Sequence, residues 1–324
     1  MSDSDKDEVN GSQDYAGGDQ SNERCLVSVN QFNLDDFAVD EETVDLTHCR
    51  VDEIPDLSRF TALKELSLRQ NFLIRINGNL TMTTLTQLDL YDNQIEKISN
   101  LDELVNLEAL DLSYNRIHKI EGLSNLKNLL RIYFVHNKIS VIEGLEALTK
   151  LELLELGDNR IKKIERIEHM ENLRELYLGK NKIIKIENIG KLKNLRVLSI
   201  PSNRLTNLDG IETVPFIKEL YVSEQGLQNL SELKALNDLT IIDASNNLIS
   251  CLDGVNHLQE LEDLWLNDNK VSDWHEVEKL AKMPALRTIY LEHNPIYKAD
   301  PTAYRRKMIL VLQQVKQIDA TDCR

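Results

Sequence analysis

The chain has 324 residues, of which 41% are hydrophobic, 28% charged and only 5% aromatic, and its formal net charge is −16. This is ordinary globular composition with an aliphatic core, and it contains no run of about 18 apolar residues that would predict a membrane span. The acidic, polar N-terminus is unlike a signal peptide, and the four cysteines lack metal-ligand spacing. We therefore expect reduced thiols inside the cell and no contact with a membrane.

The charge is concentrated at the N-terminus. Residues 1–42 hold twelve acids and two bases, which leaves −6 on the rest of the chain. The same segment has few apolar side chains, so burial cannot offset the entropy lost on ordering it. We expect residues 1–38 to form an acidic disordered tail. Beyond it the two signs are interspersed along the sequence, which does not predict the basic stripe of a nucleic-acid binder.

A 22-residue period then governs the chain. Each unit contains a phrase such as LEALDLSYN (107–115), which ends on asparagine. A short amide at a sharp turn can satisfy backbone donors and acceptors inside the coil. Cys49 and Gln225 fill two of these slots, and the longer Gln225 predicts a local irregularity. The predicted structural ladder consists of Asn71, Asn93, Asn115, Asn137, Asn159, Asn181, Asn203, Asn247, Asn269 and Asn294.

The rest of the unit defines the fold. Alternating apolar residues predict a short strand before each asparagine, and apolar residues three apart predict tight 3₁₀-like turns after it. One unit cannot bury its apolar side chains alone, whereas stacked units form a continuous core. We predict an α/β leucine-rich-repeat solenoid of about twelve 22-residue coils. A curved parallel sheet should line its concave face, with 3₁₀ or short helical turns on its convex face.

The two ends of the stack need caps. Residues 39–54, which include the half-pattern VDLTHCRVDEI, predict an N-terminal cap, and residues 55–294 form the repeats. The spacing widens to 25 between the last two asparagines, which indicates an insertion of three around residues 282–284. Residues 295–324 predict a C-terminal cap, in which apolar residues at helical spacing over 304–319 form a closing helix.

No catalytic or cofactor motif is present. The chain lacks phosphate-binding glycine loops, a nucleophile elbow and a zinc-binding histidine pair, so we predict no catalytic residue, no cofactor and no metal ligand. Residues 131–134 fit a short basic-aliphatic-x-aromatic docking motif. Ile132 and Phe134 occupy core slots of their repeat, however, so the folded chain cannot present that motif.

The strand positions that alternate with the core leucines should face the concave side. In chain order they are Ser67, Asp89, Asp111, Tyr133, Glu155, Tyr177, Ser199, Tyr221, Asp243, Trp265 and Tyr290. Five of the chain's 17 aromatic residues fall on this line, and we expect Trp265 to be exposed there. Tyrosine and tryptophan dominate the energetics of protein interfaces, so this mixture of acids and aromatics predicts a protein-binding face.

With its number of repeats, its acidic-aromatic concave face and the segment RTIYLEHNPIYKADPTAYRRKMILVLQQVKQIDA (287–320), the chain resembles the protein phosphatase 1 regulatory subunit 7 family. The resemblance covers residues 40–324. It implies a non-catalytic subunit that binds the phosphatase catalytic subunit through the concave face and controls its maturation, activity or targeting. The implied partner-binding positions are Asp111, Tyr133, Glu155, Tyr177, Asp243, Asp263, Trp265 and Tyr290.

The resemblance further implies residence in nucleus and cytoplasm, a role in the cell cycle, and a second inhibitory subunit in some complexes. We expect the free protein to be a monomer that binds no nucleic acid. Two positions weaken the match, because the family can carry phenylalanine where this chain has Tyr133 and Tyr177, and each hydroxyl then needs a partner. The alternative is a leucine-rich-repeat adaptor for a ciliary, dynein-assembly or ribonucleoprotein complex.

Overall fold

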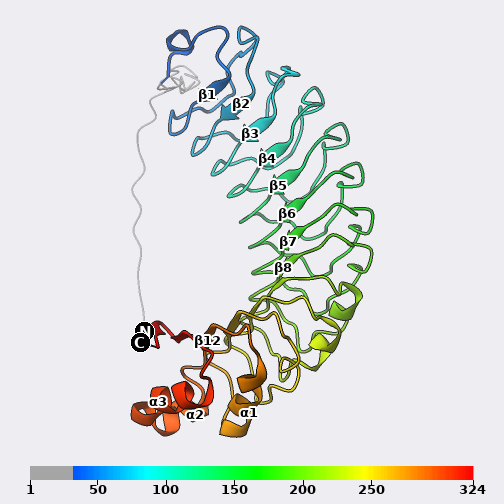
Figure 1. Ribbon diagram of the computed structural model, residues 1–324. Helices are drawn as coiled ribbons and strands as arrows, with labels where there is room; N and C mark the ends of the chain where they lie inside the picture. The colour runs from blue at the N-terminus through cyan, green and yellow to red at the C-terminus, as the bar shows by residue number, and fades with distance from the viewer. Residues whose placement is uncertain (1–31, 324) are drawn as a thin grey trace, which may run out of the picture.

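The structure is a computed structural model that describes residues 32–323, and these form one curved stack of coils with the strands along its inner side (Figure 1). Strands β1 to β13 pair in parallel in chain order, and β14 closes the sheet by antiparallel pairing with β13. The strands are β1 (Thr43–Asp45), β2 (Glu65–Ser67), β3 (Gln87–Asp89), β4 (Ala109–Asp111), β5 (Arg131–Tyr133), β6 (Leu153–Glu155), β7 (Glu175–Tyr177), β8 (Val197–Ser199), β9 (Glu219–Tyr221), β10 (Ile241–Asp243), β11 (Asp263–Trp265), β12 (Thr288–Tyr290), β13 (Gln317–Ile318) and β14 (Thr321–Asp322). The predicted leucine-rich-repeat solenoid is therefore confirmed, with two short strands added at its C-terminal end.

Helical segments are few. They are η1 (Leu34–Asp36), η2 (Ile211–Thr213), η3 (Ser231–Ala235), α1 (Trp274–Lys279), η4 (Leu280–Lys282), α2 (Pro295–Ala299) and α3 (Pro301–Val311). The expected 3₁₀ turns on the outer side are present only beyond β8, and the coils between β2 and β8 return through irregular turns. The coil with the three-residue insertion holds α1 and η4, so the extra residues are accommodated as helix between β11 and β12.

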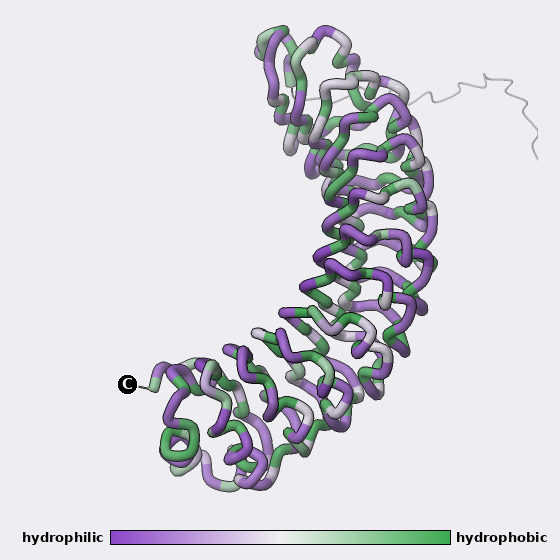
Figure 2. The backbone as a smooth tube through the Cα atoms, turned by 45° about the vertical axis from the view of Figure 1, so that its right-hand side comes forward, coloured by the Kyte–Doolittle hydropathy of each residue, from purple (hydrophilic) through white to green (hydrophobic). Residues whose placement is uncertain are grey.

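The core is a continuous aliphatic column. The central residue of each strand from β1 to β12 is buried, and hydrophobic and hydrophilic segments alternate within the coils along the whole stack (Figure 2). Phe134 is the one phenylalanine with no exposed surface within the described residues, and Ile132 is equally buried. The docking motif over residues 131–134 is therefore closed to partners, as predicted.

The ladder asparagines bind each coil to the one before it. The Asn115 side-chain oxygen accepts from Ile95 N at 2.9 Å, and its amide donates to Leu90 O at 2.9 Å, both in the preceding coil. The same amide donates to Leu112 O and Ser113 O of its own coil at 3.1 Å. All ten ladder asparagines make these four contacts at the equivalent positions.

The two exceptional slots differ in how much of this pattern they keep. Gln225 accepts from Leu205 N at 2.9 Å and donates to Ile200 O, so it retains both bonds to the preceding coil. Its side chain makes no bond to its own coil among the described residues, which is the local irregularity that the longer side chain predicts. Cys49 is only half-buried, and its Sγ lies 3.5 Å from Thr47 O.

Each asparagine turn needs a left-handed residue just before it. The twelve residues that precede the ladder positions, from His48 to His293, have φ between 52° and 64°, and none is glycine. This conformation costs roughly 1–2 kcal/mol for a residue with a Cβ atom. The buried amide bonds of the next residue offset that cost, so the ladder stabilises the backbone as well as the stacking.

A second left-handed turn lies seven residues after the ladder asparagines. Gly144 has φ +71° there, and a Cβ atom on it would lie 2.3 Å from Ile120 O of the preceding coil. Asn188 has φ 60° at the equivalent position, and its amide donates to Ile164 O at 2.7 Å. Glycine at this slot leaves room for the carbonyl and asparagine binds it, but Arg166 adopts φ 60° at the same slot, so a longer side chain is also accepted.

The caps differ from their predicted boundaries. Residues 1–31 of the predicted tail lie outside the described residues, but Leu34–Asp36 form η1, which the ion pair of Arg59 with Asp35 at 2.5 Å fastens to the first coil. At the other end α3 stops at Val311 rather than continuing to residue 319, and β13 and β14 follow it. No helix within the described residues has the length and apolar character to cross a membrane.

Replacing Asn159 with alanine should leave one backbone N–H and three carbonyls without their buried partner. We expect the free energy of unfolding to fall by about 3 kcal/mol. Gln225→Asn should raise the free energy of unfolding by about 1 kcal/mol, because an asparagine amide can also donate to the carbonyls of its own coil. Urea unfolding followed by circular dichroism checks both, and equal effects of the two substitutions would contradict this account of the ladder.

Candidate functional site

The sheet places the predicted partner-binding residues in two groups. Asp111, Tyr133, Glu155 and Tyr177 lie in register on the adjacent strands β4 to β7. Asp243, Asp263, Trp265 and Tyr290 lie together on β10 to β12. Strands β8 and β9 separate the groups and carry Ser199 and Tyr221 at the same position. All eight side chains are half-buried, so the expectation that Trp265 is exposed is wrong, because the neighbouring strands crowd its ring.

The carboxylates of this face also stabilise their own turns. Asp111 accepts a hydrogen bond from Ser113 N at 2.8 Å, and Asp243 accepts from Ser245 N at 3.0 Å. These backbone N–H groups follow the strand ends, where the ladder does not reach them. The second oxygen of Asp243 makes no hydrogen bond or ion pair within the described residues, whereas that of Asp111 lies 4.0 Å from Arg69. At β8 the corresponding residue is Pro201, which has no N–H, and the strand there ends on Ser199.

Glu155 is the most perturbed acid of the face. One of its oxygens accepts from Gly157 N at 2.8 Å, and burial among the neighbouring strands raises its pKa to about 7. A Cβ atom at residue 157 would lie 2.7 Å from that oxygen, so only glycine admits this position of the carboxylate. Burial also raises the pKa of Asp111 above its usual range. The face therefore holds carboxylates that a positively charged partner group would stabilise in their ionised form.

The tyrosines differ in whether the hydroxyl is paired. The Tyr177 hydroxyl donates to Glu175 at 2.8 Å, and the Tyr221 hydroxyl donates to Glu219 at the same distance. Burial, followed by this bond to a carboxylate, raises the pKa of both phenols. The Tyr133 hydroxyl has no partner within residues 32–323. Of the two hydroxyls that needed a partner, Tyr177 has one and Tyr133 keeps its bonding capacity for another molecule.

An aromatic pair occupies the C-terminal group. The rings of Trp265 and Tyr290 meet edge to face with centroids 6.1 Å apart. The Tyr290 hydroxyl is 2.9 Å from Gln317 Nε2 on β13, which fixes that ring. The indole N–H of Trp265 is buried and has no acceptor among the described residues. The Asp263 carboxylate beside it makes no hydrogen bond or ion pair within the same range, so this group offers both a free carboxylate and an unpaired donor.

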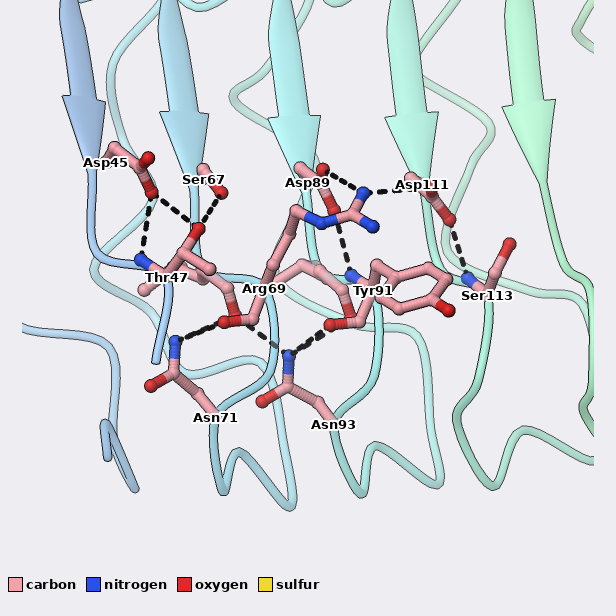
Figure 3. A network of polar contacts seen from close by, with 12 residues as sticks. Asp45, Thr47, Ser67, Arg69, Asn71, Asp89, Tyr91, Asn93, Asp111 and Ser113 are labelled. Atoms are coloured by element: carbon pink, nitrogen blue, oxygen red, sulfur yellow. Dashed lines mark hydrogen bonds and ion pairs between the residues drawn. The ribbon is translucent and has the colours of Figure 1, made fainter. Parts of the chain in front are cut away.

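A further cluster beside β2 to β5 was not predicted. Arg69 contacts Asp89 at 2.8 Å and Asp111 at 4.0 Å, and its guanidinium lies 4.1 Å from the ring centroid of Tyr91 (Figure 3). Tyr91 is followed by Tyr114 and then His136, with successive ring centroids 4.9 and 4.8 Å apart. These residues precede the ladder asparagines by one or two positions. Reading those columns across repeats, rather than only the strand column, would have found them.

One group of donor atoms has metal-ligand spacing but holds an ammonium. Cys251, Asp253 and Glu276 bring donor atoms within 4.8 Å of one another. Lys279 Nζ lies 2.5 Å from Asp253 and 2.8 Å from Glu276, so one ammonium already pairs with both carboxylates. The arrangement is an ion-pair cluster between α1 and the preceding coil.

Comparison with known proteins agrees with this architecture. A family model described as leucine-rich repeats in two copies matches residues 83–125 and 171–213. An internalin from Listeria monocytogenes superposes with a TM-score of 0.73 over 87% of each chain at 24% identity. A leucine-rich-repeat protein from Leptospira interrogans gives a TM-score of 0.76 over 85% of this chain and 71% of that one at 26% identity. The protein is a leucine-rich-repeat solenoid.

The curated relatives carry the names of one family of regulatory subunits. A Caenorhabditis elegans protein named protein phosphatase 1 regulatory subunit SDS22 homolog is 51% identical over 63 residues, 19% of each chain. The proteins named protein phosphatase 1 regulatory subunit 7 from Xenopus tropicalis and Homo sapiens are 49% and 47% identical over 51 residues, 16% of this chain and 14% of each relative. The aligned segments thus span about a fifth or less of these relatives. Their names confirm the family resemblance, and they describe regulatory rather than catalytic subunits.

The raised pKa of Glu155 links stability to pH. The folded state favours the protonated acid, so its contribution to stability is greatest below about pH 4.5 and is lost as the pH rises through about 7. Glu155→Gln removes this ionisation. We expect the melting temperature of the variant relative to the native protein to increase between pH 5 and pH 8. Thermal unfolding across that range checks this, and a constant difference would show that Glu155 titrates normally.

Proposed function

We propose that this protein is a non-catalytic regulatory subunit that binds the catalytic subunit of protein phosphatase 1 through its concave face. The observation that carries the proposal is that the curated relatives named above are all regulatory subunits of that phosphatase. The face supplies a suitable surface, with carboxylates and large aromatic rings in two groups on one rigid sheet. Buried motif residues at 132 and 134 also favour binding by a folded surface over binding by a short linear segment.

The chemistry of the face indicates the kind of contact. Asp111, Glu155 and Asp263 are ionisable acids, and burial already raises the pKa of the first two. A lysine or arginine of the phosphatase that reaches them would gain attraction at low local dielectric. Trp265 and Tyr290 would supply the apolar anchor, and the buried indole N–H would gain an acceptor.

The regulatory role follows from the same family. We propose that the complex controls maturation, activity or targeting of the phosphatase in nucleus and cytoplasm, including during the cell cycle. A second inhibitory subunit would bind in a ternary assembly, and the free chain would be a monomer. An adaptor role in a ciliary or ribonucleoprotein complex is the alternative, and the names of the relatives favour the phosphatase.

Binding can be measured by titration calorimetry with purified phosphatase catalytic subunit. We expect a complex with micromolar or tighter affinity, and Trp265→Ala with Glu155→Lys should weaken it at least a hundredfold. That variant removes the aromatic anchor and places a cation in the acidic group, and a loss of about 2–4 kcal/mol is typical of an interface anchor alone.

A matched control makes the same two kinds of change elsewhere. Phe216→Ala with Glu103→Lys removes one exposed aromatic ring and reverses one exposed acid away from the concave column. This variant should bind within threefold of the native chain. An equal loss of affinity in both variants would show that the concave face is not the binding surface. If the native protein did not bind at all, the proposed partner would be wrong.

A further inference from the structure

A column of five cations runs along the stack beside the ladder asparagines. The residue directly after the ladder asparagine is basic in five consecutive coils, namely Arg116, Lys138, Arg160, Lys182 and Arg204. We call these five residues the basic ladder. In the sequence these five residues are 22 positions apart with acidic residues between them, so positive and negative charges are interspersed along the chain. The folded chain nevertheless aligns these five cations in a single row, which the interspersed charges of the sequence do not reveal.

Backbone hydrogen bonds hold the basic ladder in register. Lys138 N donates to Ile117 O, Arg160 N to Ile139 O and Lys182 N to Ile161 O, each at 2.8 Å. Arg116 N and Arg204 N make the equivalent bonds at 2.9 Å. Each cation thus follows the next at the spacing of adjacent strands, about 4.8 Å, and the five span roughly 19 Å.

The positive charges are not neutralised locally. Within residues 32–323 none of the five side chains forms an ion pair within 4.0 Å or donates a hydrogen bond, and all but the half-buried Lys138 are exposed. The nearby acids serve other cations, since Glu121 contacts Lys97 and Lys119, each at 3.7 Å, and Glu143 contacts Arg166 at 3.3 Å. Like charges at this spacing repel, so the basic ladder lowers the stability of the free protein.

We propose that the basic ladder binds an extended acidic segment of a partner protein. An extended chain advances about 3.3 Å per residue, so roughly six residues rich in aspartate or glutamate would match its length. The chemistry favours a peptide over nucleic acid. Single-stranded nucleic acid is usually held by aromatic rings as well as cations. Exposed rings stand two residues before only the first two cations, where Tyr114 and His136 stack on each other. The other three cations have Asp158, Lys180 and Ser202 at that position. A row one cation wide, with acids such as Glu165 and Glu187 in the same coils, also offers no broad basic surface to a duplex.

This site is independent of the concave face, so its failure would leave the phosphatase proposal untouched. The probe is a fluorescein-labelled ten-residue polyglutamate, titrated with the full chain at 50 mM NaCl and followed by anisotropy. Arg116→Glu with Arg160→Glu and Arg204→Glu should weaken binding at least tenfold. The control variant changes the net charge equally at three scattered exposed positions, Lys127→Glu, Lys191→Glu and Lys234→Glu. It should weaken polyglutamate binding less than threefold. Equal losses would overturn the proposal.

Two further arms exclude other occupants. A labelled ten-residue oligouridylate that binds as tightly as polyglutamate, and is lost in the same triple variant, would assign the site to nucleic acid. Neutralising Asp3, Asp5, Asp7 and Glu8 together should leave the affinity for polyglutamate within threefold. A tenfold rise would assign the site to the chain's own acidic N-terminal segment. Either result overturns binding of an acidic partner.

A last measurement separates binding from folding. Lys138→Glu places an acid between Arg116 and Arg160, so it should raise the melting temperature while weakening polyglutamate binding. A structural role for the lysine would lower the melting temperature instead, which would contradict the unrelieved repulsion on which the proposal depends.

Discussion

The architecture depends on one buried side-chain amide per coil. Each ladder asparagine satisfies an N–H and a carbonyl of the preceding coil and two carbonyls of its own. A residue with positive φ precedes each amide, and most of these backbone groups are buried. A buried polar group without a partner costs about 1–3 kcal/mol, so without the amide this turn would be unstable. Because the bonds cross to the neighbour, the same contact sets the turn, the stacking and the register of the sheet.

Register in turn creates the surfaces. A repeat of 22 residues places chemically related side chains one strand spacing apart, whatever lies between them in sequence. The concave column mixes acids with aromatics, and acids such as Asp111, Glu155 and Asp243 bind an N–H group that follows their own strand. The basic ladder has no such side-chain partners within the described residues. The two columns therefore differ. Some acids of the concave column already accept hydrogen bonds from the backbone, whereas the cations of the basic ladder have no ion-pair partner within residues 32–323.

Most of the fold could be predicted because the repeat is local and periodic. Asn71 to Asn294, the buried Ile132 and Phe134, and the concave column all follow from counting positions within one unit. The departures arise where contacts between units decide the outcome. Trp265 is half-buried because neighbouring strands crowd it, and α3 ends at Val311 because the last residues form strands that extend the sheet. The stack of Tyr91, Tyr114 and His136 joins two different columns and was not visible in either alone.

The sequence predicts where the residues of the candidate site lie, but not their pKa values or which of their hydroxyls are hydrogen-bonded. Alternation places Glu155 on the concave face, yet its pKa near 7 requires the depth of burial and the close approach of Gly157. Tyr177 follows Glu175 by two residues on β7, whereas Tyr133 follows Arg131 by two residues on β5. The structure shows that the Tyr177 hydroxyl donates to Glu175, while the Tyr133 hydroxyl has no partner within residues 32–323. Such differences depend on side-chain conformation within one coil, which the repeat pattern does not give.

The glutamine at position 225 has a mechanical consequence. In a stack of coils each coil contacts only its two neighbours, so the contacts within and between adjacent coils determine how firmly each part is held. The interface below Gln225 carries two side-chain bonds to the coil before it, but the coil itself lacks the internal amide bracing found elsewhere. That coil lies between the two groups of concave residues. The turn that carries Gln225 is therefore less braced internally than the other ladder turns, although it stays attached to the coil before it.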